Sequence, residues 1–327
     1  MTLKRKVSLT FLFLSLFLSS VSGKEKNFPL EIDVIFSPCF CNEKIYIFSE
    51  NGRNQTLKEK ENAPKCNLFP LNPILQPICF KDKVFVVDKD GTFYFMSDDG
   101  VKPVGSFSEK IIGVHIFQEK LYIVSEKKIT EFEGIDYNLN FNVISSFLTD
   151  KGIAIFGERE FIFFQGSKEM RSYPFSGKDI RGAVVLKDNF VTCQDNAICF
   201  LNKRGKIFRK YTVKSQIVSA LYVDENKIAV ASEDHFVRLF DRKGNVLWQF
   251  RIDGIPLQLE VTKNGILCAS KNGSSLVLID SKKGTEKWQY SIKDGEIRSF
   301  TVKNLKVFFY SLKENLESVL NIVEIPE

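Results

Sequence analysis

One short pattern recurs along most of this 327-residue chain: a polar turn, then four or five apolar residues with β-branched or aromatic side chains. Eight such runs can be aligned, and their first apolar residues lie 32 to 41 residues apart. Those residues are Ile45, Val84, Leu121, Ile153, Phe190, Ile228, Ile266 and Val307. A period near 40 residues, built from short strands and tight turns, predicts the four-stranded blades of a ring-shaped propeller.

The composition of the runs and the turns between them favour strands over helices. The runs are rich in Val, Ile, Phe and Tyr, and no window has the 3.6-residue periodicity that helical repeats need. Pairs such as Asp90-Gly91 and Asn272-Gly273 suit tight hairpins, because glycine accepts the positive φ of those turns. A blade alone cannot bury both of its faces, so we expect the 31 phenylalanines to fill the wedges between blades.

The two ends of the chain predict how the ring closes. The last unit has one strand after Val307, near residues 318–325, and so lacks its outer edge. Segment 28–33 precedes the first inner strand and is expected to supply that edge, which covers an otherwise open sheet. We therefore predict an all-β fold: a single propeller over residues 24–327 with eight four-stranded blades, closed by an N-terminal strand. Seven blades are the alternative, since one step between units is only 32 residues.

Residues 1–23 have the three parts of an export signal. Positions 4–6 are basic, residues 7–18 are mostly apolar, and Val21-Ser22-Gly23 offers the small residues that signal peptidase requires. We predict a signal peptide over residues 1–23 and export to the periplasm or outside the cell; an uncleaved N-terminal anchor is the alternative. No second apolar run of spanning length follows, so no integral membrane span is expected after cleavage.

Charge and histidine content narrow the functional classes. Beyond residue 23 the chain has 43 basic and 40 acidic residues, which are spread along it, so nucleic acid is not an expected partner. Only two histidines occur, which argues against most His-rich metal sites. His115 lies within an apolar run and is expected to be a hydrogen-bonded structural residue. His235 is expected in an exposed turn at one rim, next to Asp234, with no recognisable nucleophile.

All seven cysteines follow the predicted signal peptide, where an oxidising compartment permits disulfides. Cys39 and Cys41 are two apart, so on a strand they face the same side and do not easily bridge each other. Cys193 and Cys199 flank a turn and could be neighbours across two strands. Cys268 lies mid-strand and is as well explained as a small buried hydrophobe. The pairing is left open, and the spacing does not suggest zinc.

Two stretches carry a family resemblance. Residues 230–241 resemble the inner hairpin of a WD40 blade, whereas residues 244–250 and 278–290 resemble the outer part of PQQ-like propeller repeats. Trp248 and Trp288 each follow a glycine by four residues and are 40 residues apart, which marks them as structural repeat positions. In outline the chain is most similar to the BamB-like propellers of the outer-membrane β-barrel assembly machinery. The resemblance implies a propeller that binds proteins in the cell envelope.

PQQ-like propellers also include quinoprotein dehydrogenases, so an enzyme has to be considered. Those enzymes carry adjacent cysteines, a Ca²⁺ site and more tryptophans, whereas this chain has no adjacent cysteine pair and two tryptophans. The fragment Asp88-Lys89-Asp90-Gly91 lacks the remaining ligands of a Ca²⁺ loop and is better explained as a hairpin turn. Phosphate-binding and hydrolase motifs are also missing from the sequence. We therefore expect no catalytic residues, no cofactor and no metal ion.

The combined expectation is an exported, monomeric, non-catalytic scaffold for protein partners, in cell-envelope or outer-membrane protein assembly. The alternative is a small-molecule-binding or PQQ-dependent-dehydrogenase-like enzyme. Partner contacts are expected at the rim turn Glu233-Asp234-His235, because loops on rigid scaffolds commonly carry binding. The long loop 51–73 is the other candidate, expected as a solvated excursion.

Overall fold

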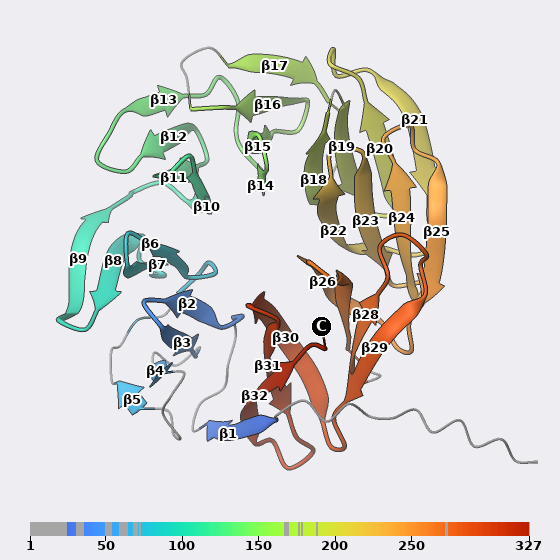
Figure 1. Cartoon of the computed structure of the whole chain (residues 1–327). Coiled ribbons are helices and arrows are strands. Elements are labelled where there is room, and N and C mark those ends of the chain that lie inside the picture. Colours follow the sequence, from blue (N-terminus) through green and yellow to red (C-terminus); the bar gives the residue numbers. More distant parts are fainter. Residues whose placement is uncertain are drawn as a thin grey trace, which may run out of the picture.

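The computed structural model shows eight antiparallel sheets arranged as blades around one axis (Figure 1). The predicted signal peptide, residues 31–33 of the predicted closing segment and the predicted turn at 272–273 lie outside the described residues. The described residues are 25–30, 36–49, 54–58, 65–67, 71, 73–166, 170–175, 177, 179–187, 189–271 and 274–326.

Each blade contains four strands, and blades are numbered in chain order. Blade 1 has β2 (Cys39–Cys41), β3 (Lys44–Phe48), β4 (Asn54–Lys58) and β5 (Lys65–Asn67). Blade 2 has β6 (Ile78–Phe80), β7 (Lys83–Val87), β8 (Thr92–Ser97) and β9 (Gly100–Ser106). Blade 3 has β10 (Ile111–Phe117), β11 (Lys120–Ser125), β12 (Lys128–Glu131) and β13 (Asp136–Asn138). Blade 4 has β14 (Ser145–Thr149), β15 (Gly152–Phe156), β16 (Glu160–Phe164) and β17 (Arg171–Pro174).

The second half of the ring repeats this order. Blade 5 has β18 (Ile180–Leu186), β19 (Asn189–Gln194), β20 (Ala197–Leu201) and β21 (Ile207–Thr212). Blade 6 has β22 (Ile217–Asp224), β23 (Lys227–Ser232), β24 (Phe236–Asp241) and β25 (Val246–Arg251). Blade 7 has β26 (Pro256–Thr262), β27 (Gly265–Ser270), β28 (Ser275–Ile279) and β29 (Glu286–Ser291). Blade 8 has β30 (Glu296–Lys303), β31 (Lys306–Leu312), β32 (Ser318–Glu324) and β1 (Lys26–Leu30).

Blade 8 joins the two ends of the chain. Strand β1 pairs antiparallel with β32, from Lys26 opposite Ile322 to Leu30 opposite Ser318. The N-terminal strand is therefore the outer edge of the last blade, as predicted, and the eight-bladed propeller is confirmed. The 32-residue step that left seven blades open is accommodated by short outer strands in blade 3, where β12 has four residues and β13 three.

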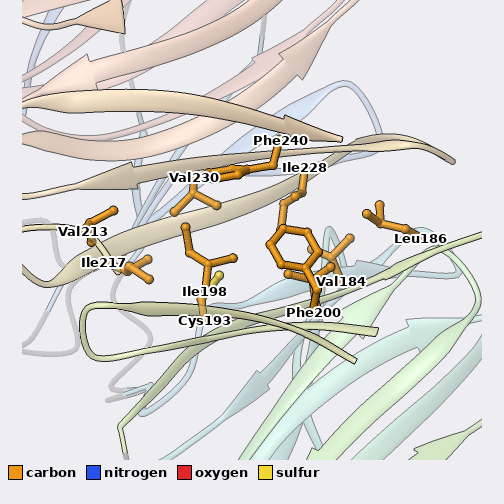
Figure 2. Packing of buried hydrophobic residues seen from close by; sticks show 11 residues of the cluster. Val184, Leu186, Cys193, Ile198, Phe200, Val213, Ile217, Ile228, Val230 and Phe240 are labelled. Carbon is orange, nitrogen blue, oxygen red and sulfur yellow. The ribbon is translucent and has the colours of Figure 1, made fainter. Parts of the chain in front are cut away.

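Apolar side chains from neighbouring blades pack face to face and form the core. Figure 2 shows one such layer, where strands of blade 5 meet strands of blade 6. Phe200 from β20 and Phe240 from β24 are fully buried there, beside Ile228 and Val230 of β23. Burial of apolar surface between blades is the main stabilising contribution, since each blade is too thin to have a core of its own.

Aromatic rings fill the wedges between blades, as expected from the phenylalanine content. Between blades 4 and 5, the ring of Phe161 stacks on Tyr173 with centroids 4.9 Å apart. The same ring meets Phe190 of the next blade edge-on at 5.3 Å. Such offset and edge-to-face contacts add to the area-dependent stabilisation.

The expectation of a solvated loop over residues 51–73 is wrong. Strands β4 and β5 lie within this range, and β4 pairs with β3 along its whole length. Asn54, Gln55 and Leu57 of β4 are buried. The polar composition concealed the strand, because pairing with β3 outweighs the weak intrinsic preference of these residues.

Candidate functional site

Turns of equivalent type share a face of the ring. In every blade the strands alternate in direction, so the turn between the second and third strands lies on the same face as the loop that enters the next blade. We call this the upper face. The rim turn 233–235 lies on it, between β23 and β24.

A cleft of about 820 Å³ opens on the upper face between blades 4 and 5. It is lined by Ile144, Ser145, Glu158, Arg159, Gly177, Asp179, Ile180 and Arg181. Four of these side chains are charged and exposed, two of each sign, and they come from turns and loops of both blades. Mixed charges beside the apolar side chains of Ile144 and Ile180 suit a polypeptide segment with its own charged groups better than a purely apolar ligand.

Backbone hydrogen bonds hold the blade 4 turn that forms one wall of this cleft. The amide of Gly157 donates to the backbone carbonyl of Glu160 at 2.8 Å, and the amide of Phe175 donates to the backbone carbonyl of Arg159 at 2.9 Å. At Gly177 an added Cβ would lie 2.6 Å from the ring of Phe175, which disfavours a larger residue there. Glu158 and Arg159 project from a turn held by backbone hydrogen bonds, which favours binding because little of that backbone has to be ordered.

The predicted rim turn has one exposed member, Glu233. The side chain of Asp234 is 6% exposed and forms a bidentate ion pair with Arg238, with contacts of 2.9 and 2.7 Å. Ser232 donates a hydrogen bond to the same carboxylate at 2.5 Å. The expected exposure of Asp234 is wrong, because its carboxylate turns inward and pairs with the buried guanidinium of Arg238 on β24.

Burial and pairing act in opposite directions on the pKa of Asp234. Burial opposes ionisation of this carboxyl, but the hydrogen bonds from Arg238 and Ser232 outweigh it and lower the pKa. His235 is half-buried, and its Nδ1–H donates to the carbonyl of Gly254 at 2.6 Å. The role of the turn as a partner contact stays a prediction, carried by Glu233.

The two tryptophans lie at equivalent outer positions but have different surroundings. The indole Nε1 of Trp248 donates to the carbonyl of Ser281 at 3.1 Å. Gly284, with φ at +68°, lies so close that an added Cβ would be 2.5 Å from that ring. Trp248 thus joins blade 6 to the outer turn of blade 7. Trp288 stacks on Tyr290 instead. In blade 8 the third strand, β32, and the fourth strand, β1, are far apart in the sequence, so no short turn joins them.

Two titratable side chains link neighbouring inner strands. Nε2 of His115 on β10 lies 2.8 Å from the Ser146 hydroxyl on β14, as expected of a structural histidine, and burial lowers its pKa to about 4. Glu260 on β26 accepts the amide hydrogen of Val302 on β30 at 2.9 Å. Burial raises the pKa of Glu260 to about 7, although this hydrogen bond opposes the shift. The strand position of Glu260 gave no sequence signal for this role.

The structure bears on the cysteine pairing that the sequence left open. Cys193 and Cys199 are both unpaired, because Cys193 lies opposite Ile198 and Cys199 lies opposite Thr192. A one-residue offset in register directs the two thiols to opposite faces of blade 5. A disulfide instead joins Cys41 to Cys79, with Cα atoms 5.3 Å apart, and connects β2 of blade 1 to β6 of blade 2.

Two further features concern metals and membranes. Among the described residues, no group of three or more His, Cys, Asp and Glu side chains is arranged to hold a metal ion. The same part of the chain contains no helix long and apolar enough to cross a membrane.

Comparisons with known proteins agree with this architecture. A family model described as outer membrane protein assembly factor BamB matches residues 174–314. A comparison with curated proteins finds no match. Among solved structures, the computationally designed Ika8 protein has a TM-score of 0.72 at 13% identity, covering 92% of this chain and 100% of that chain.

Two natural propellers are similar in the same way. BamB from Moraxella catarrhalis has a TM-score of 0.59 at 12% identity, covering 73% of this chain and 83% of that chain. Sqt1 from Saccharomyces cerevisiae has a TM-score of 0.69 at 11% identity, covering 92% of this chain and 98% of that chain. At these identities the likeness concerns the fold. The chain is thus an eight-bladed propeller, and its residues 174–314 match the family model described as outer membrane protein assembly factor BamB.

Proposed function

We propose that this protein is an exported, non-catalytic scaffold that binds a polypeptide partner on its upper face, in the assembly of cell-envelope or outer-membrane proteins. The observation that carries the proposal is the cleft between blades 4 and 5, which is lined by two acidic and two basic side chains. The BamB-related repeats support the envelope setting, since they cover blades 5 to 7 completely and blade 5 forms one wall of the cleft.

Chemistry at the cleft supports recognition of a polypeptide segment. Arg159 and Arg181 each offer a planar fork of donors for carboxylates or backbone carbonyls. Glu158 and Asp179 can pair with basic side chains, and the exposed Ile144 offers an apolar contact. Ser145 adds a buried hydroxyl without a hydrogen-bond partner in the described structure, which an entering polar group would satisfy.

Affinity purification from the native envelope tests the proposal. We expect the wild-type protein to recover a specific partner and the R159E/R181E variant to lose it. The K89E/K102E variant is the matched control, because Lys89 and Lys102 are exposed and lie in blade 2.

Deletion of the gene is expected to lower the amounts of outer-membrane proteins, and the control variant to restore them where R159E/R181E does not. An unchanged outer-membrane composition would refute the assembly role. Recovery of a bound quinone with dehydrogenase activity, and of no protein partner, would replace the scaffold by an enzyme.

A further inference from the structure

A second surface lies on the opposite face, where the turns between the third and fourth strands of blades 5, 6 and 7 meet the outer wall. These turns, with the strand starts that follow them, are residues 202–210, 241–247 and 280–287, and we call them the outer strip. In Figure 1 the strands that start here, β21, β25 and β29, follow one another along the outside of the ring.

Contacts between blades make the outer strip continuous. Gly244 of the second turn lies against blade 5, where an added Cβ would be 2.6 Å from Cγ of Arg209 and 3.0 Å from the ring of Phe200. Gly284 of the third turn lies against Trp248 of blade 6. Because each turn is seated on the outer strand of the blade before it, the three turns occupy equivalent heights around the ring.

The outer strip is strongly basic, although the chain as a whole is nearly balanced. Its three segments contain ten lysines and arginines and three carboxylates. Two of those carboxylates hold the turns: Asp241 accepts the amides of Lys243 and Asn245 at 2.8 and 2.9 Å, and Asp280 accepts those of Lys282 and Lys283 at 2.8 Å each. The carboxylates of Asp241 and Asp280 therefore face backbone amides. The lysine and arginine side chains of the three turns are exposed, except for the half-buried Arg242.

Large apolar side chains are exposed directly beside these cations. Ile207 and Phe208 start β21, and Val246 and Leu247 start β25, with exposures of 36 to 47%. Both pairs immediately follow a basic turn and occupy equivalent positions in neighbouring blades. Apolar residues flanked by lysine and arginine are the combination that peripheral proteins use at a bilayer surface, where cations meet headgroups and apolar groups enter the interface.

We propose that the outer strip docks this protein on a bilayer that carries anionic phospholipid headgroups. Turns at equal height can meet one flat anionic surface together. A second copy of the chain is less suitable, because it would bring its own net positive charge of +6 to a basic strip. The proposal is independent of the cleft on the upper face.

Vesicle co-sedimentation of the full chain tests the proposal, using phosphatidylcholine vesicles with and without phosphatidylglycerol. We expect binding that needs phosphatidylglycerol and weakens as salt is raised. The variant R204E/K243E/K283E reverses one charge in each turn. Since each basic side chain near an anionic membrane contributes a factor of about five, the loss of three is expected to weaken binding by about a hundredfold.

The control variant K89E/K102E/K127E changes the net charge equally at exposed positions of blades 2 and 3, and its binding is expected to stay close to wild type. A second variant, I207S/L247S, keeps all charges and is expected to bind less tightly. Binding that does not require phosphatidylglycerol, or equal binding of the strip and control variants, would overturn the proposal. So would vesicle-independent capture of an acidic protein that is lost in R204E/K243E/K283E, which would assign the strip to a protein partner.

Discussion

Removing the disulfide between Cys41 and Cys79 is expected to destabilise the protein at blade 1. Blade 1 starts with a three-residue inner strand and ends with a three-residue outer strand, so few ladder hydrogen bonds hold it. The bridge ties its inner strand to that of blade 2 and closes a loop with a sequence separation of 38 residues. Closing a loop of this length lowers the entropy of the unfolded chain and so raises the free energy of unfolding by about 4 kcal/mol at 25 °C.

Guanidinium unfolding of the double variant C41S/C79S measures this loss. We expect a lower midpoint and a steeper slope, because the unfolded chain without the cross-link exposes more surface, and we expect reduced wild-type protein to match the variant. Hydrogen exchange should quicken first in strand β3, since blade 1 loses its link to blade 2. Cys268→Ala is the control, because that thiol is buried and unpaired, and it should affect oxidised and reduced protein equally.

The reasoning would be refuted by a fully alkylatable Cys41 in unreduced native protein. It would also be refuted if reduction of the wild type left the unfolding midpoint unchanged. Either result would mean that blade 1 is held by its strand pairing alone.

Three further substitutions test other parts of the fold. Asp234→Ala leaves the guanidinium of Arg238 buried without its partner, and calorimetry should show a loss of about 3 kcal/mol. Folding raises the pKa of Glu260 from 4.5 to about 7, so its contribution to the free energy of unfolding is present below pH 4.5 and is lost as the pH rises through 7. Glu260→Gln should remove this pH dependence when unfolding is measured across the range. Gly284→Ala should cost about 1 to 3 kcal/mol in urea unfolding, through its left-handed φ and the neighbouring indole. Gly105→Ala, where an added Cβ meets only an ordinary contact at 3.6 Å, should cost much less. Equal losses at both glycines would contradict the close packing of Gly284 against Trp248.

Features of the fold that are local in sequence could be predicted from the residues. The apolar runs that start at Ile45, Ile228 and Val307 are second strands of their blades, because a buried strand needs consecutive β-branched or aromatic residues. Closure by the N-terminal strand followed from counting strands in the last unit. Polar β4 was missed, since nothing in its composition marks a buried strand.

Features that join different blades could not be predicted in the same way. The bridge between Cys41 and Cys79 depends on the distance between two inner strands, which the sequence does not encode locally. The opposite directions of Cys193 and Cys199 depend on a register that is decided by one residue. The cleft was missed for the same reason, because its charged side chains come from loops of two blades and no single motif contains them.

Photo-cross-linking at the cleft tests the central functional claim most directly. A photoreactive amino acid at Ile144, on the cleft wall, should give a discrete adduct with one envelope protein in living cells. The same residue at Val104, exposed on the outer strand of blade 2, should give none. The adduct should disappear when R159E/R181E is added to the Ile144 variant. No adduct at Ile144, or equal adducts at both positions, would contradict a partner-binding upper face.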